Sequence, residues 1–248
     1  MQKVNNLMRY SKKGITVEKK DVLIIIPAYN EEANIVRVVK QLEQEYSQYD
    51  YIVVNDGSKD NTADICINEG FNLLDLPVNL GLSGAFQSGM KYAYKKGYKY
   101  AIQFDGDGQH LPQYIDSLLK EMEKGNEIVI GSRFVTEKKP RTLRMFGSNM
   151  ISLAIKFSTG KKINDPTSGM RMYNRSMIEK FAKNMDYGPE PDTISHLIRN
   201  GVKVSETQVK MEERIAGESY LNAGKAMMYM IRMICSILII QNFRKKEG

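Results

Sequence analysis

Residues 22–30 read VLIIIPAYN, and this stretch decides the fold class. Its continuous apolar run, ended by Pro27, is typical of a parallel strand that is covered on both faces. A helix is expected next, with Asn30 as its N-cap and with Glu31 and Glu32 in its first turn. The ordered part of the chain is therefore predicted to begin with a strand followed by a helix.

The same alternation of strand and helix continues to about residue 133. Further strands are expected over 51–56, 71–76, 98–105 and 127–133, and further helices over 60–68, 83–96 and 112–124. This spacing predicts an α/β fold whose mostly parallel central sheet is wrapped by helices on both faces.

Beyond residue 133 the pattern changes without a linker or an internal repeat. A basic loop, a helix at 144–159, a turn and strand at 165–174 and a helix and strand at 192–211 are expected there. We therefore expect a single domain over 21–221. It follows a basic N-terminal arm at 1–20 and precedes an amphipathic helix and basic tail at 222–248.

Composition narrows the class of protein. A chain of 248 residues, 42% of them hydrophobic, can bury one sizeable core. Its two cysteines are far apart, and its first residues contain no apolar run of signal-peptide length, so a cytoplasmic protein is expected. The net charge of +7 favours anionic partners such as nucleotide phosphates or acidic lipid headgroups. Nucleic-acid binding is not favoured, because the sequence contains no basic motif interleaved with aromatic residues.

Polar residues follow the predicted strands at the edge where open parallel sheets bind ligands. They are Tyr29 to Glu31 after the first strand, Asn55 to Ser58 after the second, Asp105 to Gln109 after the fourth, and Ser132 and Arg133 after the fifth. Asp105 and Asp107, one residue apart, can share a hard divalent cation, and Gly106 lets the backbone approach a diphosphate. An ordinary acidic turn on the surface would have the same sequence. The metal site is nevertheless favoured, because Asp56 and Glu31 follow neighbouring strands and add polar groups at the same edge.

Three other ligand-binding motifs are not supported. Counted from Asp105, an EF-hand would need Gly and Glu where His110 and Asp116 stand, and the segment follows a strand. No P-loop motif occurs, and NLGLSGAF lacks the spacing and position of a dinucleotide-binding loop. Phosphates would then be held by a metal together with Arg133.

Six segments occur in order between residues 21 and 171. They are IIPAYNEE, VVNDGSKDNT, NLGLSGAFQSGM, QFDGDGQHLP, GSRF and DPTSGMR. Together they resemble the family 2 glycosyltransferases of the Rossmann-like GT-A fold, and within these the polyprenyl-phosphate sugar transferases similar to dolichol-phosphate mannose synthase. The resemblance implies inverting, single-displacement transfer of a sugar from a UDP- or GDP-linked donor, with Mg²⁺ or Mn²⁺ as cofactor.

The resemblance also implies roles for individual residues. Donor binding falls to Pro27, Tyr29, Glu31, Asp56, Asp105 and Gly106, metal binding to Asp105, Asp107 and Gln109, and acceptor binding to Arg171, Arg214 and Ser219. Arg133 would face the phosphates or the acceptor and is, with Asp107, a candidate catalytic residue. Two positions depart from the family pattern: Asn55 stands where many relatives have Asp, and Tyr220 where lipid-phosphate enzymes often have Lys.

The chemistry of the acceptor decides whether a catalytic base is needed. A sugar hydroxyl must lose a proton, and Glu190 and Asp192 are the candidate bases, although both also suit a helix N-terminus. A lipid phosphate is already anionic and needs cations instead. The leading prediction is transfer to a polyprenyl phosphate such as undecaprenyl phosphate, for cell-surface glycan assembly. The alternatives are transfer to a hydroxyl of a lipid-linked oligosaccharide and, in third place, a non-catalytic nucleotide-binding assembly subunit.

From Lys225 onward the sequence predicts a helix with a narrow polar stripe. Lys225, Tyr229, Arg232 and Ser236 recur among apolar residues, and the apolar part is too short to span a bilayer. The helix could lie in the interface at the inner, cytoplasmic face of the cell membrane, with the basic residues 244–246 near anionic headgroups, or dock onto a membrane-protein partner. A core helix is the other interpretation. The oligomeric state stays open, a homo-oligomer included.

Overall fold

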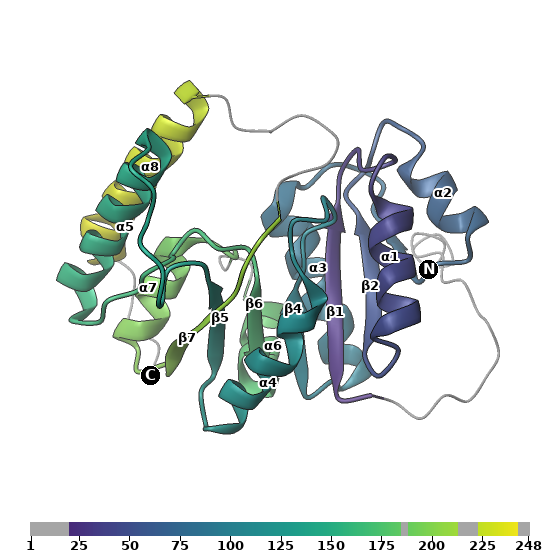
Figure 1. Ribbon diagram of the computed structural model, residues 1–248, viewed down its shortest axis with the longest axis horizontal. Helices are drawn as coiled ribbons and strands as arrows, with labels where there is room; N and C mark the ends of the chain where they lie inside the picture. The colour runs from purple at the N-terminus through teal and green to yellow at the C-terminus, as the bar shows by residue number, and fades with distance from the viewer. Residues whose placement is uncertain (1–19, 185–187, 213–222, 243–248) are drawn as a thin grey trace, which may run out of the picture.

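The computed structural model describes residues 20–184, 188–212 and 223–242, and these form a layered α/β structure (Figure 1). Within them one seven-stranded sheet runs in the order β3-β2-β1-β4-β6-β5-β7. The strands are β1 (Val22–Ala28), β2 (Asp50–Asn55), β3 (Leu73–Asp75), β4 (Tyr100–Gln103), β5 (Ile128–Ser132), β6 (Arg171–Asn174) and β7 (Val204–Gln208). β1 to β4 are mutually parallel, β6 is antiparallel to both of its neighbours, and β5 pairs in parallel with β7.

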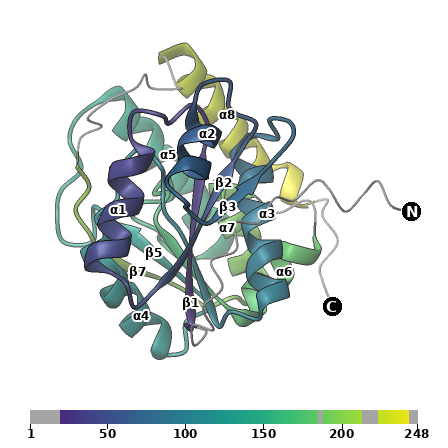
Figure 2. The same ribbon diagram turned by 90° about the vertical axis from the view of Figure 1, so that its right-hand side faces the viewer.

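Helices cover both faces of the sheet, as predicted (Figure 2). They are α1 (Ile35–Glu45), α2 (Thr62–Asn68), α3 (Gly81–Lys96), α4 (Ile115–Glu123), α5 (Leu143–Thr159), α6 (Arg175–Lys183), α7 (Pro191–Arg199) and α8 (Ala223–Leu238), with short 3₁₀ turns at Pro112–Tyr114 and Ile240–Asn242. Alternate strand residues point to opposite faces. Ile24 and Ile26 pack with α1, α2 and α4, whereas Leu23 and Ile25 pack in the core that contains α3 and α5 to α8.

The first helix begins later than predicted. α1 starts at Ile35 with Asn34 at its N-cap, so the expected cap at Asn30 was wrong. Asn30 has a positive φ of 56°, and its Oδ1 accepts a hydrogen bond from the backbone N–H of Lys59 at 2.8 Å. Asn30 thus joins two loops at the sheet edge, and this tertiary contact outweighs its local preference for capping.

α5 and α8 pack against each other beside the end of the sheet that carries β7 (Figure 1). A Cβ on Gly147 of α5 would lie only 1.4 Å from Sδ of Met230, so the missing side chain lets the two helices approach closely. Met233 and Ile237 of α8 are buried in the core. No helix in the described ranges is long and apolar enough to cross a bilayer. The predicted arm at 1–20 lies outside these ranges except for Lys20.

Candidate functional site

The predicted acidic residues meet at one edge of the sheet. β2, β1 and β4 are adjacent, so the loops after their carboxyl ends lie side by side. The backbone N–H of Asp56 donates to the carbonyl of Ala28 at 2.9 Å, which joins the first two loops. The loops after β1, β2 and β4 therefore form one continuous rim, as the sequence predicted.

Asp56 is buried at the N-terminal end of α3. Its side chain accepts hydrogen bonds from the backbone N–H groups of Leu80, at 2.7 Å, and Gly81. Burial raises the pKa of Asp56, and the two N–H donors oppose that rise. Gly57 has a φ of +61°, and a Cβ there would lie 2.7 Å from the backbone N of Asn79. Asp56 thus holds the loop before α3 against the rim.

Asn55, one of the departures from the family pattern, has a partner that suits an amide; the other, Tyr220, lies outside the described residues. The Nδ2 of Asn55 donates to Oδ1 of Asp75 at the end of β3, at 2.7 Å. An aspartate at position 55 would place two carboxylates in contact there, whereas an amide supplies the donor. Asn55 therefore links the end of β2 to the end of β3.

The remaining donor-side residues lie at the end of β1 and just beyond it. Pro27 and Tyr29 are half-buried. The side chain of Glu31 accepts from Nδ2 of Asn34 at 2.8 Å, and its backbone N–H donates to Thr62 at 2.9 Å. These contacts link the loop after β1 to the start of α2.

Asp105 and Asp107 occupy the loop after β4. Asp107 is buried, and its Oδ1 accepts the backbone N–H of Gln109 at 3.0 Å. The backbone N–H of Asp105 donates to Nδ1 of the buried His110 at 2.9 Å, and His110 Nε2 lies 3.5 Å from Oδ2 of Asp105. Because Nδ1 accepts, the ring proton sits on Nε2, facing the carboxylate. His110 therefore holds both the backbone and the side chain of Asp105. The sequence placed His110 close to Asp107 but favoured a structural role for it.

The arrangement suits a hard divalent cation. Asp105 and Asp107 present oxygen ligands from one short loop, and Gln109, whose Nε2 lies 3.4 Å from the carbonyl of Glu212, belongs to the same loop. Within the described ranges no three His, Cys, Asp or Glu side chains gather as a closed metal cage. Mg²⁺ sites of this kind use one or two carboxylates and leave the other positions to substrate phosphates and water. The residues fit a cation shared with a diphosphate.

Two glycines let backbone approach Asp105 and its loop. A Cβ on Gly106 would lie 3.1 Å from the carbonyl oxygen of Pro27. A Cβ on Gly169, in the segment before β6, would lie 2.6 Å from Oδ2 of Asp105. The segment 165–170 therefore packs directly on the predicted metal ligand, although it lies more than sixty residues later in the chain.

Gly169→Ala is expected to weaken Mn²⁺ binding about tenfold, because the new methyl group would push the Asp105 carboxylate out of place. The atoms it meets belong to a side chain, so the fold should survive. Calorimetric titration with Mn²⁺ measures the affinity, and the thermal unfolding midpoint serves as the control. Unchanged Mn²⁺ affinity would show that Gly169 does not shape this site.

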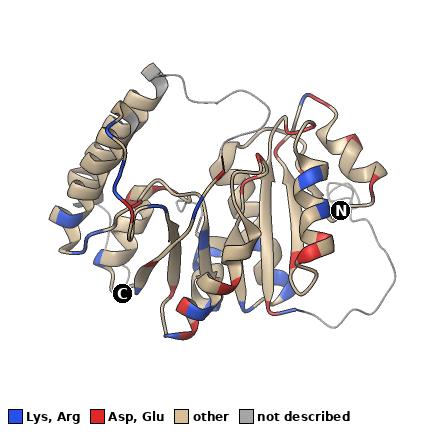
Figure 3. Cartoon of the chain, viewed as in Figure 1, with Lys and Arg blue, Asp and Glu red and all other residues tan. Residues whose placement is uncertain are grey.

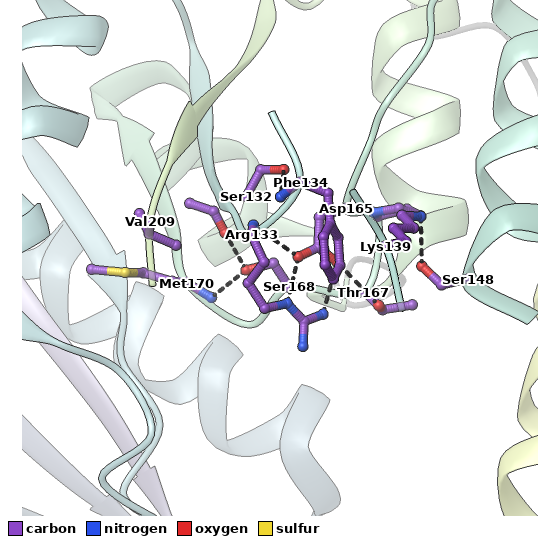
Figure 4. A network of polar contacts seen from close by, with 12 residues as sticks. Ser132, Arg133, Phe134, Lys139, Ser148, Asp165, Thr167, Ser168, Met170 and Val209 are labelled. Carbon is purple, nitrogen blue, oxygen red and sulfur yellow. Dashed lines mark hydrogen bonds and ion pairs between the residues drawn. The ribbon is translucent and has the colours of Figure 1, made fainter. Parts of the chain in front are cut away.

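Arg133 is fixed at the end of β5 by a buried carboxylate (Figure 4). Its Nε and Nη2 donate to the two oxygens of Asp165 at 2.7 and 2.8 Å, and Asp165 is fully buried. The backbone N–H of Asp165 in turn donates to Glu206 at 2.8 Å. The sequence singled out Arg133 but missed Asp165, although it is the first residue of the DPTSGMR segment.

A cationic pocket lies beside Arg133, with a volume of about 270 Å³. Its lining contains three lysines, Lys138, Lys139 and Lys162, against one acidic residue, Glu137, together with Asn149 and Ser152 of α5. Lys139 Nζ donates to Ser148 at 3.2 Å, and burial lowers the pKa of Lys139 while Asp165 and Glu206 oppose that fall. Only the basic character of the loop at 137–144 hinted at this pocket in the sequence.

Arg171, a predicted acceptor-binding residue, is buried among backbone carbonyls. Its guanidinium is buried, with 1% exposure, and donates to the carbonyls of Ser168, Pro166 and Pro189 at 2.7 to 2.9 Å. Arg171 thus joins the segment before β6 to the loop before α7, and its role in acceptor binding stays a prediction. The other two predicted acceptor residues, Arg214 and Ser219, lie outside the described residues.

The candidate bases Glu190 and Asp192 contact α8. The Tyr229 hydroxyl donates to Glu190, and Ser236 Oγ donates to Oδ2 of Asp192 at 2.6 Å. Asp192 also lies in the first turn of α7, where the helix dipole favours its charge. Of the polar stripe predicted for the C-terminal helix, Tyr229 and Ser236 thus face α7, whereas Arg232 is exposed. A role as base stays a prediction for both carboxylates.

Comparisons with known proteins show which family the chain belongs to. Residues 23–182 match the model of glycosyl transferase family 2. The chain is 28% identical to the polyprenol monophosphomannose synthase of Mycolicibacterium smegmatis over 224 residues, 85% of this chain and 84% of that protein. It is 29% identical to the undecaprenyl-phosphate mannosyltransferase of Micrococcus luteus over 216 residues, 82% and 88% of the two chains.

Solved structures show the same fold. Glucosyl-3-phosphoglycerate synthase from Mycobacterium tuberculosis, in complex with Mn²⁺, UDP and phosphoglyceric acid, aligns with a TM-score of 0.67 at 16% identity, over 91% of this chain and 80% of that one. This likeness confirms the predicted GT-A fold. Since the family model covers well over half of the sequence, the chain belongs to glycosyl transferase family 2.

Proposed function

We propose that this glycosyltransferase moves a sugar from a nucleotide-sugar donor to a polyprenyl phosphate. The proposal rests on one observation: the segment 165–170 contacts both the acidic rim and the arginine next to the lysine pocket. Gly169 packs on Asp105 of the acidic rim, while Asp165 holds Arg133 beside the lysine pocket. An acidic, cation-binding rim next to a cationic pocket suits a donor diphosphate and an anionic acceptor. The names of the two relatives support this choice of acceptor.

On the donor side, Pro27, Tyr29, Glu31 and Asp56 would receive the base and ribose of a UDP- or GDP-linked sugar. Asp105, Asp107 and Gln109 would hold Mg²⁺ or Mn²⁺. Such a cation neutralises charge on the diphosphate leaving group. The residues around it contribute orientation: His110 and Gly169 fix Asp105, and the N–H of Gln109 fixes Asp107.

On the acceptor side, a lipid phosphate requires cations and no base. Its oxygens are ionised near neutral pH, so attack on the sugar needs no proton removal. Arg133 is held rigid by two hydrogen bonds to Asp165, which lowers the cost of ordering it around an anion. Lys139 and Lys162 line the adjoining pocket and add positive charge. Direct attack in one displacement inverts the configuration at the transferred carbon.

The acceptor assay separates this function from its rivals. Purified protein is incubated with labelled UDP- and GDP-sugars, Mn²⁺ and undecaprenyl phosphate, and the products are extracted into organic solvent. Label in the organic phase is expected. Label only on longer lipid-linked saccharides would instead favour the hydroxyl-transferring alternative with Glu190 or Asp192 as base. No transfer to any acceptor would favour a non-catalytic assembly subunit.

The variant Lys139→Gln tests, in the same assay, whether the lysine pocket binds the acceptor. Losing one charge in the pocket is expected to raise KM for the lipid phosphate about tenfold and to leave KM for the donor unchanged, because Lys139 lies on the acceptor side. Lys120→Gln on the exposed side of α4 is the matched control and should change neither value. Equal effects of Lys139→Gln on both KM values would contradict the division into donor and acceptor surfaces.

A polyprenyl acceptor lies in a membrane, so the reaction would take place at a membrane surface. The proposed location is the cytoplasmic face, with peripheral attachment. The C-terminal helix predicted for this attachment is α8, whose Tyr229 and Ser236 face the start of α7. Its other side therefore has to supply any contact with lipid.

A further inference from the structure

α5 carries a continuous stripe of exposed apolar side chains. Leu143, Phe146, Met150, Leu153 and Phe157 recur at spacings of three and four residues, so they lie on one side of the helix. Their exposed fractions are high, from 39% for Met150 to 85% for Phe157. At 1.5 Å per residue the stripe extends for roughly 20 Å. Single exposed apolar residues are ordinary, but a row of this length is not.

α8 carries a second stripe next to the first. Met228, Ile231, Cys235 and Leu238 are exposed and follow the same three-and-four spacing, with Met227 at the margin. On α5, Gly147 faces Met230 of α8, and the exposed stripe lies beside that contact. On both helices the opposite side is buried in the core. The two rows therefore adjoin and form one apolar face, called here the α5–α8 face.

The surroundings of the α5–α8 face are strongly basic. Residues 137–162 contain seven Lys or Arg and a single acidic residue, Glu137. Lys138 and Arg141 precede α5, Lys156 lies in its last turn, and all three are exposed. Neither α5 nor α8 contains an Asp or Glu, and Figure 3 shows no red on either helix.

We infer that the α5–α8 face docks onto an anionic lipid surface, with α5 contributing as much as the C-terminal helix. A flat apolar area bordered by Lys and Arg is the pattern of interfacial helices, which bury their apolar side at the headgroup boundary while their cations meet anionic lipids. This inference rests on the proposed function for its purpose, because the acceptor would lie in the same membrane. The lysine pocket beside α5 would then open close to the lipid surface.

The basic residues around the α5–α8 face favour a lipid surface over a second copy of this chain as its binding partner. In a symmetric dimer the basic borders of two identical faces would meet each other, and like charges brought together oppose association. An anionic bilayer complements the same border. A membrane is thus the occupant that satisfies both the apolar and the charged parts of the surface.

The chain supplies its own probe for this contact. Cys235 is exposed in the middle of the α8 stripe, whereas Cys66 is buried and burial raises its thiol pKa to about 12. A thiol-reactive, environment-sensitive fluorophore should therefore label Cys235 selectively. With vesicles of equal parts phosphatidylglycerol and phosphatidylcholine, a blue shift and co-sedimentation are expected. With phosphatidylcholine alone, or at high salt, both should weaken.

Charge substitutions on exposed residues test the two parts of the surface separately. Phe157→Glu should weaken vesicle binding about tenfold or more, because it removes a large buried apolar group from the contact. Ile67→Glu, which alters a residue with 50% exposure on α2, is the matched control and should have no effect. Lys156→Glu should weaken binding about fivefold or more, and Lys120→Glu on α4 should not.

The results distinguish a lipid surface from a second copy of the chain as the partner of the α5–α8 face. Binding of equal strength by Phe157→Glu and wild type, or no blue shift at Cys235, would overturn the inference. A dimer without lipid that Phe157→Glu converts to monomer would assign the face to a second copy instead. Transfer to a short, water-soluble prenyl phosphate should be the same for Phe157→Glu and wild type. If wild type transfers sugar to no acceptor yet still binds anionic vesicles, the proposed function fails and the docking surface stands.

Discussion

Asp107→Asn is expected to lower sugar transfer at least about a thousandfold. The substitution removes one anionic ligand from the proposed cation, and metal stabilisation of a leaving group contributes several kcal/mol to such reactions. The amide oxygen of Asn can still accept the N–H of Gln109, so the loop should keep its shape. Transfer rates and Mn²⁺ titrations of the same preparation measure the two effects together.

The control for Asp107→Asn is Glu123→Gln, which removes an exposed carboxylate from the end of α4 that leads into β5. It should keep wild-type transfer and wild-type Mn²⁺ affinity. Chelation of the metal from the wild-type enzyme should reproduce the defect of Asp107→Asn, and added Mn²⁺ should reverse it. Full turnover by Asp107→Asn would refute the metal role of the loop after β4.

Asp165→Asn is expected to reduce both stability and transfer. Breaking an ion pair that includes a fully buried carboxylate costs about 3 kcal/mol, because the remaining charge loses its partner. Transfer should fall about a hundredfold, since Arg133 would lose the bidentate contact that orients it. Chemical unfolding measures the first effect, and transfer assays well below the unfolding temperature measure the second.

The exposed pair between Lys99 and Asp21, with a separation of 3.9 Å, gives the comparison for Asp165→Asn. Asp21→Asn should change the free energy of unfolding by less than about 0.5 kcal/mol, because solvent screens exposed pairs. It should not affect transfer. If Asp165→Asn lost stability but kept full transfer, the carboxylate would serve only the fold, and Arg133 would need another explanation.

Most of the fold followed from local pattern. β1 to β5 and α3 to α5 were predicted because apolar runs and helical periodicity report burial directly. The antiparallel insertion of β6 between β4 and β5 was not predicted, since strand order depends on pairing between segments about seventy residues apart. α6 was missed as well. The start of α1 was misplaced because Asn30 is engaged by a loop from another part of the chain.

The candidate site also contains residues that could be predicted from the sequence and residues that could not. The position of Asp105, Asp107 and Asp56 on one rim was predictable, because loops at the carboxyl ends of adjacent parallel strands must meet. The partners of Asp105 and Arg133 were not predictable, since Gly169 and Asp165 lie in the segment before the antiparallel strand β6. Arg171 shows the limit most clearly. A motif can mark an arginine as important, but only packing reveals that carbonyls enclose its guanidinium.

The contacts between α8 and α7 have a consequence for the order of synthesis. Glu190 and Asp192 receive their partners from Tyr229 and Ser236, some forty residues later in the chain. A nascent chain still lacking those residues could complete the sheet and the cation loop but would leave both carboxylates without these donors. The side-chain contacts between the start of α7 and α8 can therefore form only after α8 has been synthesised.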